Sequence, residues 1–277
     1  MLAVTSRPPL AHRGVPAVRR TARRLTLPAA LRNGELLTYF QPLVSVDGQL
    51  KGCEALARWR LPDGTFASPA DFIAAAERTG FIHLLGETVL REALTQLPRF
   101  EAAGLGSLFM SVNISTRQLE HPDFEGVLTR VLAETGVAPG RLSLEVTEGV
   151  AVTDLPRATA MLTRIAGTGV RISLDDYGTG YAGLTYLRLF PVSTIKLDRS
   201  FIQDLESDRI TRILVKAVVR LADELGLRTI AEGVETPSQA SAVKELGFDY
   251  IQGYLYGKPM PADELIARFA LPSTLIH

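Results

Sequence analysis

The sequence predicts an α/β protein, a (β/α)8 barrel in which helices surround a closed ring of strands. Apolar runs typical of strands end repeatedly in a polar residue, at Asn113, Glu145, Asp175, Lys196 and Glu232. The steps between these residues are 32, 30, 21 and 36 residues long, which is enough for one strand and one returning helix. The chain has 277 residues and no linker-like break after its opening segment, which favours one barrel over two domains.

The opening segment differs in composition from the rest. Residues 1–34 contain seven arginines and four prolines but no acid. Such a composition cannot build a core, so we predict an Arg-rich flexible tail over residues 1–25 and a barrel domain over residues 26–272. The arginines suit an acidic partner, although a run of charge is more often simply solvated.

The barrel elements follow in order. Two strands are expected over 36–44 and 49–59, and the Asp47-Gly48 pair between them predicts a hairpin. Apolar spacing near 3.6 residues then predicts helices over 69–80 and 81–97. The remaining strands are expected at 107–114, 141–147, 169–175, 193–197, 228–231 and 249–252, and the remaining helices at 123–135, 155–167, 181–188, 208–225 and 237–246. With the hairpin, this makes eight strands.

Composition narrows the classes of function. Thirty basic and thirty acidic residues give a net charge of zero, so no overall field attracts DNA or a membrane surface. The single cysteine, Cys53, excludes an internal disulfide and a cysteine-rich metal site. No apolar run reaches the roughly 18 to 20 residues of a membrane span, and no signal-peptide pattern opens the chain. A cytoplasmic location is therefore expected.

Two adjacent acids, Asp175 and Asp176, follow the strand that we expect to be apolar on both faces and buried. Carboxylates held this close repel each other unless a cation neutralises them. In a closed barrel, the polar residues at the strand ends converge on one mouth. The expected set is Glu54, Asn113, Glu145, Asp175, Asp176, Lys196 and Glu232, with Gln252 beside them.

This set is rich in oxygen ligands, which suit Mg²⁺ or Mn²⁺. The four histidines (His12, His83, His121 and His277) lie outside the strand ends, so zinc is not expected. One Mg²⁺ usually takes one or two carboxylates, so five of them indicate two cations. Two cations clamp the attacking and leaving oxygens of a phosphodiester, which points to metal-dependent phosphoester hydrolysis.

A glycine pattern in the same region is misleading. Gly178, Gly180 and Gly183 match G-x-G-x-x-G after a strand. In a dinucleotide site, however, the first glycine directly follows the strand, and here two acids that would repel a pyrophosphate intervene. Nicotinamide binding is therefore not expected.

Seven ordered motifs carry a resemblance to a known family: CEALARW, SVNIS, SLEVTE, LDDYGTGYAGL, IKLDRSF, IAEGVET and QGYLYGKP. From about Leu31 to Pro261 the chain resembles the EAL domain family of cyclic di-GMP phosphodiesterases. The resemblance implies a TIM-like barrel variant whose first strand runs antiparallel to the others. It also implies hydrolysis of cyclic di-GMP to linear 5'-pGpG with two Mg²⁺ or Mn²⁺ ions per site, and inhibition by Ca²⁺.

The resemblance also assigns roles to residues. Glu54, Asn113, Glu145 and Asp175 resemble the ligands of one metal, and Asp175, Asp176 and Glu232 those of the second. Lys196 resembles the lysine that orients the attacking water, and Glu232 resembles a base; with Glu54 they form the implied catalytic set. Arg58 resembles a phosphate-contacting arginine, and Gln41, Asp198 and Gln252 resemble residues of the substrate pocket. Glu148 and Glu235 resemble glutamates that brace the loop after Asp176, which supports metal binding and a homodimer interface in relatives.

Departures from the family pattern are small. Tyr177 replaces a common phenylalanine, and Ala182 and Gly183 stand where two serines are frequent. These differences bear on the rigidity of this loop and on the implied dimer contact. Two other functions remain open. One is a catalytically silent EAL domain that serves as a cyclic di-GMP receptor or protein-interaction module, and the other is a two-metal nuclease for single-stranded nucleic acid. Filled ligand positions argue against the first, and the lack of a basic, aromatic stripe argues against the second.

Overall fold

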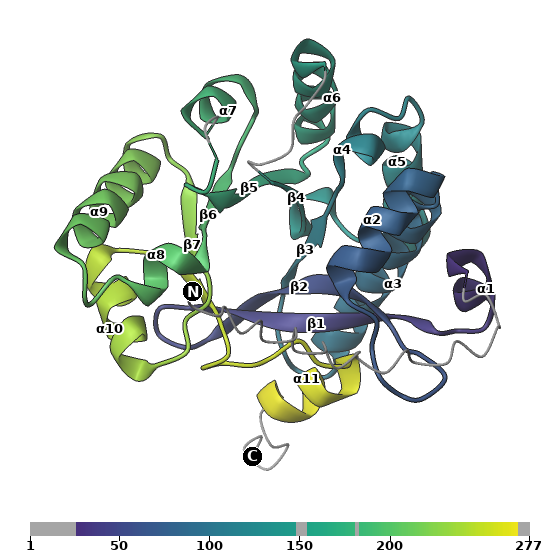
Figure 1. The fold of residues 1–277 in the computed structure, drawn as a ribbon, viewed down its shortest axis with the longest axis horizontal. Helices are drawn as coiled ribbons and strands as arrows, with labels where there is room; N and C mark the ends of the chain where they lie inside the picture. Colours follow the sequence, from purple (N-terminus) through teal and green to yellow (C-terminus); the bar gives the residue numbers. More distant parts are fainter. Residues whose placement is uncertain (1–25, 148–153, 181–182, 271–277) are drawn as a thin grey trace, which may run out of the picture.

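The structure is a computed structural model and describes residues 26–147, 154–180 and 183–270. Within these residues, eight strands form one closed barrel in the chain order β1 to β8 (Figure 1). β1 is antiparallel to both of its neighbours, β2 and β8, and every other pair of neighbours is parallel. The predicted barrel with an antiparallel first strand is therefore confirmed. The strands are β1 (Leu36–Ser45), β2 (Leu50–Trp59), β3 (Phe109–Asn113), β4 (Leu142–Thr147), β5 (Arg171–Tyr177), β6 (Thr194–Leu197), β7 (Arg228–Ala231) and β8 (Tyr250–Gln252).

Helices form the outer layer. In Figure 1, α2 to α5 lie on the right of the barrel, α6 and α7 at the top, α8 to α10 on the left and α11 below β1. The helices are α1 (Leu27–Arg32), α2 (Pro69–Thr79), α3 (Ile82–Ala102), α4 (Thr116–Leu119), α5 (Phe124–Thr135), the 3-10 turn η1 (Pro139–Arg141), α6 (Leu155–Gly167), α7 (Gly183–Leu189), α8 (Arg199–Gln203), α9 (Arg209–Glu224), α10 (Pro237–Leu246) and α11 (Ala262–Phe269). None of these helices is both long and apolar enough to span a bilayer. The predicted tail over 1–25 lies outside the described residues.

The β1–β2 hairpin changes one expectation about the site. Gly48 takes a φ of 80° in the turn, a conformation that glycine adopts freely. Both strands are ten residues long, but β2 pairs with β3 only from Gly52 to Ala55, so its second half extends past the ring. Glu54 therefore lies in the middle of β2 rather than at a strand end, and still reaches the barrel mouth.

The inner faces of four parallel strands are polar, which corrects the expectation of strands apolar on both faces. Side chains two residues apart share a face of a strand. The inward pairs are Ser111 and Asn113 on β3, Ser143 and Glu145 on β4, Ser173 and Asp175 on β5, and Thr194 and Lys196 on β6. The residues between them are apolar and at most 2% exposed beneath the helices: Val112, Leu144, Leu174 and Ile195. The apolar core thus lies between strands and helices, while the barrel axis is polar.

Candidate active site

Carboxylates from four strands or strand ends meet around one lysine at the barrel mouth. Lys196 is 1% exposed, and its Nζ lies 3.5 Å from Glu54, 3.0 Å from Glu145, 2.9 Å from Asp175 and 2.7 Å from Glu232. An ammonium group has three protons and cannot satisfy four carboxylates at once. The lysine therefore balances only part of the negative charge of this cluster.

A local distortion of β5 adds the fifth carboxylate, that of Asp176. Neighbouring residues of a regular strand point to opposite faces, but the β5–β6 register shifts between Leu174 and Tyr177. Asp176 has a φ of 52° and is the only non-glycine residue with positive φ in the described part of the chain. As a result, oxygens of Asp175, Asp176 and Glu232 lie within 4.8 Å of one another. A left-handed aspartate costs about 1 kcal/mol, and such strain is concentrated at functional sites.

Amide side chains hold Glu54 in place. Asn113 donates from Nδ2 to Glu54 Oε1 at 2.6 Å, and Gln252 donates from Nε2 to Glu54 Oε2 at 2.5 Å. Gln252 also donates to Gln41 at 3.1 Å, and Gln41 donates to the carbonyl of Gly257 at 3.3 Å. Because the Asn113 amide uses its nitrogen, its oxygen is free to act as a ligand. Residues from β1, β2, β3 and β8 thus form one network.

Burial and charge perturb the titration of this cluster. Burial raises the pKa of Glu145 well above its usual value despite Lys196, and the other carboxylates raise it further. Burial likewise raises the pKa of Glu232 to about 8. For Glu54, burial is outweighed by Lys196 and the two amide hydrogen bonds, so its pKa is lowered. Burial and Asp175 raise the pKa of Asp176. The neighbouring acids outweigh burial for Lys196, whose pKa is raised well above the usual value.

The donor set fits hard divalent cations. Buried oxygens remain unsatisfied, since Glu145 Oε1 has no hydrogen-bond partner and Asp175 Oδ1 faces Lys196 without hydrogen-bond geometry. These unpaired buried acceptors, together with the raised pKa of Glu145, show that the cluster lacks positive charge. Oxygen ligands of this kind are those that Mg²⁺ and Mn²⁺ prefer. In the described residues, the three-acid group of Asp175, Asp176 and Glu232 contains no histidine.

A cavity of about 310 Å³ opens over this cluster. Nine of the residues named from the sequence line it: Gln41, Glu54, Asp175, Asp176, Lys196, Asp198, Glu232, Glu235 and Gln252. Asn113, Glu145 and Arg58 lie outside the lining. Sequence reasoning missed Arg199 and Tyr254, which also line it. Tyr254 is 55% exposed, and Lys258 Nζ lies 5.1 Å from its ring centroid. The sequence offered one indication of its role, because Tyr254 lies two residues after the predicted pocket residue Gln252.

The remaining predicted residues are placed less directly. Arg58 is half-buried, donates to the carbonyl of Ala57 at 2.9 Å and lies 5.9 Å from the centroid of the Tyr39 ring. Asp198 lines the cavity and also caps α8, since its Oδ1 accepts from the Ser200 backbone at 3.0 Å and hydroxyl at 2.6 Å. Glu235 lines the cavity, whereas Glu148 lies outside the described residues.

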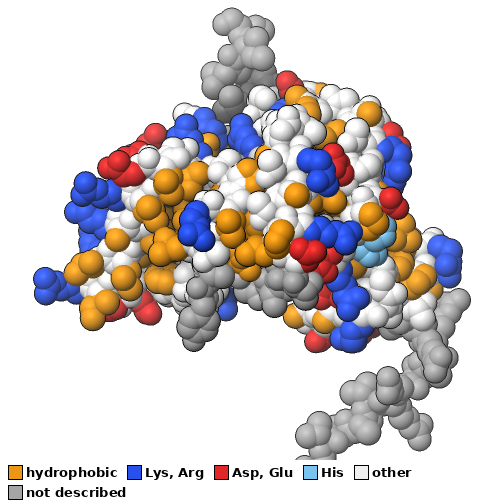
Figure 2. Space-filling view, turned by 90° about the horizontal axis from the view of Figure 1, so that it is seen from above, with side chains coloured by type: hydrophobic (Ala, Val, Ile, Leu, Met, Phe, Trp, Pro, Cys, Tyr) orange, Lys and Arg blue, Asp and Glu red, His pale blue; other side chains and the backbone are white. Residues whose placement is uncertain are grey.

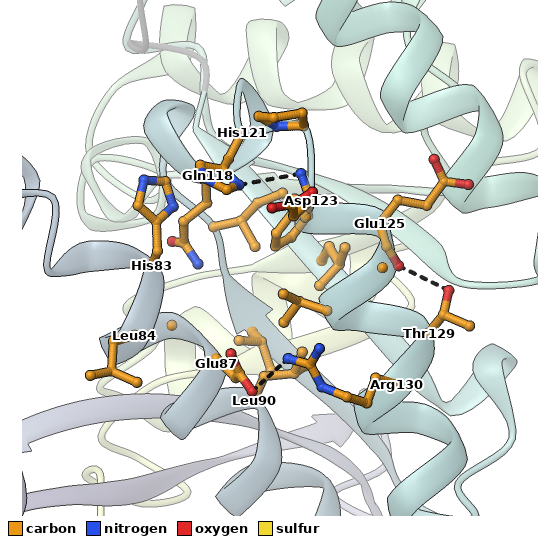
Figure 3. Close-up of a pocket in the computed structure, with 18 of the residues that line it drawn as sticks. His83, Leu84, Glu87, Leu90, Gln118, His121, Asp123, Glu125, Thr129 and Arg130 are labelled. Carbon is orange, nitrogen blue, oxygen red and sulfur yellow. Dashed lines mark hydrogen bonds and ion pairs between the residues drawn. The ribbon is translucent and has the colours of Figure 1, made fainter.

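A larger cavity, of about 1020 Å³, lies between α3, α5 and the outer side of β3 (Figure 3). His83 and His121 lie at one end of it with ring centroids 4.4 Å apart. His121 Nδ1 accepts from the backbone of Asp123 at 3.3 Å. Sequence reasoning did not pair these histidines, because 38 residues separate them. The chemistry of the smaller, acidic cavity, rather than size, identifies it as the candidate active site.

The class of this protein is a (β/α)8 barrel whose strand ends carry a carboxylate cluster that could hold a metal ion. The EAL domain family model matches residues 24–259. The chain therefore belongs to the EAL domain family.

Individual relatives agree with this assignment. The chain is 38% identical over 242 residues to MucR of Pseudomonas aeruginosa, a bifunctional diguanylate cyclase/cyclic di-GMP phosphodiesterase, covering 87% of this chain and 35% of MucR. It is 35% identical over 233 residues to the cyclic di-GMP phosphodiesterase PdeR of Escherichia coli, covering 84% and 35%. The structure of the MucR phosphodiesterase in complex with c-di-GMP matches with a TM-score of 0.81 and 38% identity, over 86% of this chain and 97% of that one. The chain spans about a third of the length of these curated relatives.

Proposed function

We propose that this chain hydrolyses one phosphodiester bond of cyclic di-GMP to give linear 5'-pGpG, which lowers the level of this second messenger. The observation that carries the proposal is the cluster of five carboxylates around Lys196 at the mouth of an EAL barrel. The relatives named above as cyclic di-GMP phosphodiesterases, and the c-di-GMP complex of the MucR domain, support the choice of substrate.

Two Mg²⁺ or Mn²⁺ ions are the proposed cofactors. Glu54, Asn113, Glu145 and Asp175 would hold one ion, and Asp175, Asp176 and Glu232 the other. When bound, the ions supply the positive charge that makes water a nucleophile near neutral pH and that balances charge on the phosphodiester.

Protein groups handle the proton and the remaining charge. Glu232 is the proposed base: the carboxyl holds a proton in the metal-free protein, where its pKa is about 8, and bound metal would displace that proton and leave a carboxylate able to accept one from water. Lys196 lies 2.7 Å from Glu232 and carries a fixed positive charge toward the place where negative charge develops. Asp175 contacts the same ammonium group, so Lys196 also fixes the positions of Asp175 and Glu232 relative to each other.

The rim of the cavity supplies groups for the nucleotide. Arg58 presents a guanidinium that suits phosphate oxygens. Gln41, Asp198 and Gln252 provide acceptors and donors for a guanine edge, with Asp198 Oδ2 left free by its capping role. The exposed ring of Tyr254 offers a stacking surface for a base.

The test is incubation of the chain with cyclic di-GMP and Mn²⁺, with the linear product followed by chromatography. Glu54→Gln keeps the size of the side chain and removes its charge, and we expect it to abolish turnover. Ca²⁺ in place of Mn²⁺ should retain the substrate uncleaved. Saturable binding of cyclic di-GMP without turnover would favour the silent receptor, and cleavage of single-stranded nucleic acid that excess cyclic di-GMP does not inhibit would favour a nuclease.

We also propose a homodimer formed through α9. Ile210, Ile213 and Leu214 are 68%, 55% and 50% exposed on this helix, at a spacing that places them along one stripe. Apolar side chains gather on the left and middle of the face seen in Figure 2, the side on which α9 lies in Figure 1. An exposed apolar stripe of this kind is typical of an interface. The loop-bracing roles of Glu148 and Glu235, the cytoplasmic location and an acidic partner for residues 1–25 stay predictions.

A further inference from the structure

A second cavity of about 310 Å³ lies at the opposite end of the barrel from the carboxylates. The first residues of five strands line it: Phe109, Arg171, Thr194, Arg228 and Tyr250. Its volume is many times the roughly 10–15 Å³ that one water molecule requires, and it falls at the lower end of the range of about 300–1,000 Å³ for small-molecule sites. Nothing in the proposed hydrolysis uses this end of the barrel.

Three buried residues present hydroxyl groups without protein partners to this cavity. Ser111, Ser143 and Thr194 are 1%, 4% and 8% exposed and line the cavity. Among the described residues, no hydrogen bond is formed by any of these three side chains. TIM-type barrels usually fill these inner layers with branched aliphatic residues. Unlike the enclosed hydroxyl of Ser173, the hydroxyls of these three residues open onto the cavity, so they are positioned to bind water or a ligand inside it.

The charge at the cavity rim selects the kind of ligand. Two guanidinium groups, Arg171 and Arg228, belong to the lining, and none of the lining residues is acidic. Arg228 is paired with Asp249 at 2.5 Å. Arg171 has no ion pair in the described part of the chain, and its guanidinium carbon lies 5.9 Å from the centroid of the Phe109 ring. That ring contact holds an unpaired positive charge at the mouth of a pocket lined with hydroxyl groups.

We propose that this cavity is a binding site for a tetrahedral oxyanion, either inorganic phosphate or the phosphate group of a small monoester. The hydroxyls of Ser111, Ser143 and Thr194 come from three strands and donate to its inner oxygens. Arg171 pairs with an outer oxygen, a charge-assisted contact. Phosphate suits this set because its oxygens accept from several directions at once, while a carboxylate has only two oxygens in one plane.

The cavity and the active site are adjacent layers of the same strands. Ser111, Ser143 and Thr194 stand two residues before Asn113, Glu145 and Lys196. Two residues of a strand rise by about 7 Å, so the bound anion lies one layer below the carboxylate cluster. Ser173 stands between the two layers on β5, fully buried with an unpaired hydroxyl. An anion here is therefore separate from the substrate phosphate, which approaches from the other end.

The test uses the full chain freed of divalent metal, so that phosphate cannot be captured by cations in the acidic cluster. Titration calorimetry at constant ionic strength would compare inorganic phosphate with glycerol 3-phosphate, which separates the two sources. The variants are Arg171→Gln, which removes the unpaired charge, and Ser143→Ala, which removes an unpaired hydroxyl without enlarging the side chain. Arg78→Gln, an exposed arginine on α2 with no ion pair in the described residues, is the matched control.

We expect saturable binding of at least one of the two anions, weakened by about tenfold or more in Arg171→Gln and in Ser143→Ala and unchanged in Arg78→Gln. Ser143→Ala should keep the melting temperature of the unliganded protein, because it removes no hydrogen bond. No saturable binding, or equal binding by all variants, would overturn the proposal and leave a water-filled cavity. Neither result depends on hydrolysis of cyclic di-GMP, so this test and that of the proposed function fail independently.

Discussion

The perturbed pKa of Glu232 leads to a quantitative prediction about metal binding. With a pKa of about 8, the Glu232 carboxyl of the metal-free protein is roughly 90% protonated at pH 7. A divalent cation binds the ionised form, so binding must displace this proton. Displacement at one unit below the pKa costs about 1.4 kcal/mol, or a factor of about ten in affinity. The Glu232 carboxyl should therefore contribute about a tenfold rise in the apparent affinity for Mn²⁺ from pH 6 to pH 7, and this contribution should level off above about pH 8.

Calorimetry in buffers of different ionisation enthalpy measures the protons released per bound Mn²⁺. Glu145 adds its own release, because its pKa is also raised, so the difference between wild type and Glu232→Gln is the informative quantity. We expect that difference to be about 0.9 proton at pH 7, the protonated fraction given by a pKa of about 8. Asp198→Asn, which changes another acid of the same cavity, should release as many protons as wild type. Equal release by wild type and Glu232→Gln would refute the reasoning.

Four further predictions test other parts of the structure. Lys196→Met leaves the carboxylates without their cation and should lower the free energy of unfolding of metal-free protein by about 3–5 kcal/mol, with much of the loss restored by Mn²⁺ in the same denaturation assay. Asp176→Ala should unfold more easily than Asp176→Asn by about 1 kcal/mol, because asparagine tolerates the left-handed backbone; equal stabilities would argue against strain at this position. Burial, with His121 and Arg117, lowers the pKa of His83, so the unfolded chain takes up the proton more readily. The contribution of His83 to stability should then fall as pH drops through about 6.5, and it is measured as the difference between urea titrations of wild type and of His83→Asn, in which the buried acids contribute equally. Ile213→Lys should give a monomer in analytical ultracentrifugation where wild type is a dimer; an unchanged mass would exclude the α9 interface.

The sequence predicted the fold well because most elements are long enough to show their period. Helices such as α9 and α10 lie within one residue of the expected ranges. α1, α4 and α8 were missed because each has six residues or fewer, which is under two helical turns. The eight-residue helix α11 was missed as well. The antiparallel direction of β1 came from the family resemblance, since spacing alone does not give strand direction.

The candidate site was only partly accessible from the sequence. Acids at strand ends are visible as a pattern, but the left-handed backbone that turns Asp176 toward Asp175 depends on the register shift between β5 and β6. The displacement of Glu54 from a strand end follows from how far β2 extends past β3. The hydrogen bonds that hold Glu54 join residues 59 and 198 positions away. Such features depend on tertiary structure, and local sequence patterns do not predict them.

The register of the parallel strands and the chemistry of the site depend on each other. A slip of one residue in β4 would turn Glu145 toward the helices and Leu144 into the barrel. That slip would bury a charge in an apolar layer without a partner, which costs several kcal/mol. β5 and β6 are constrained in the same way by Leu174 next to Asp175 and by Ile195 next to Lys196. The alternation that makes the axis polar therefore also selects the one register in which the barrel closes around its carboxylates.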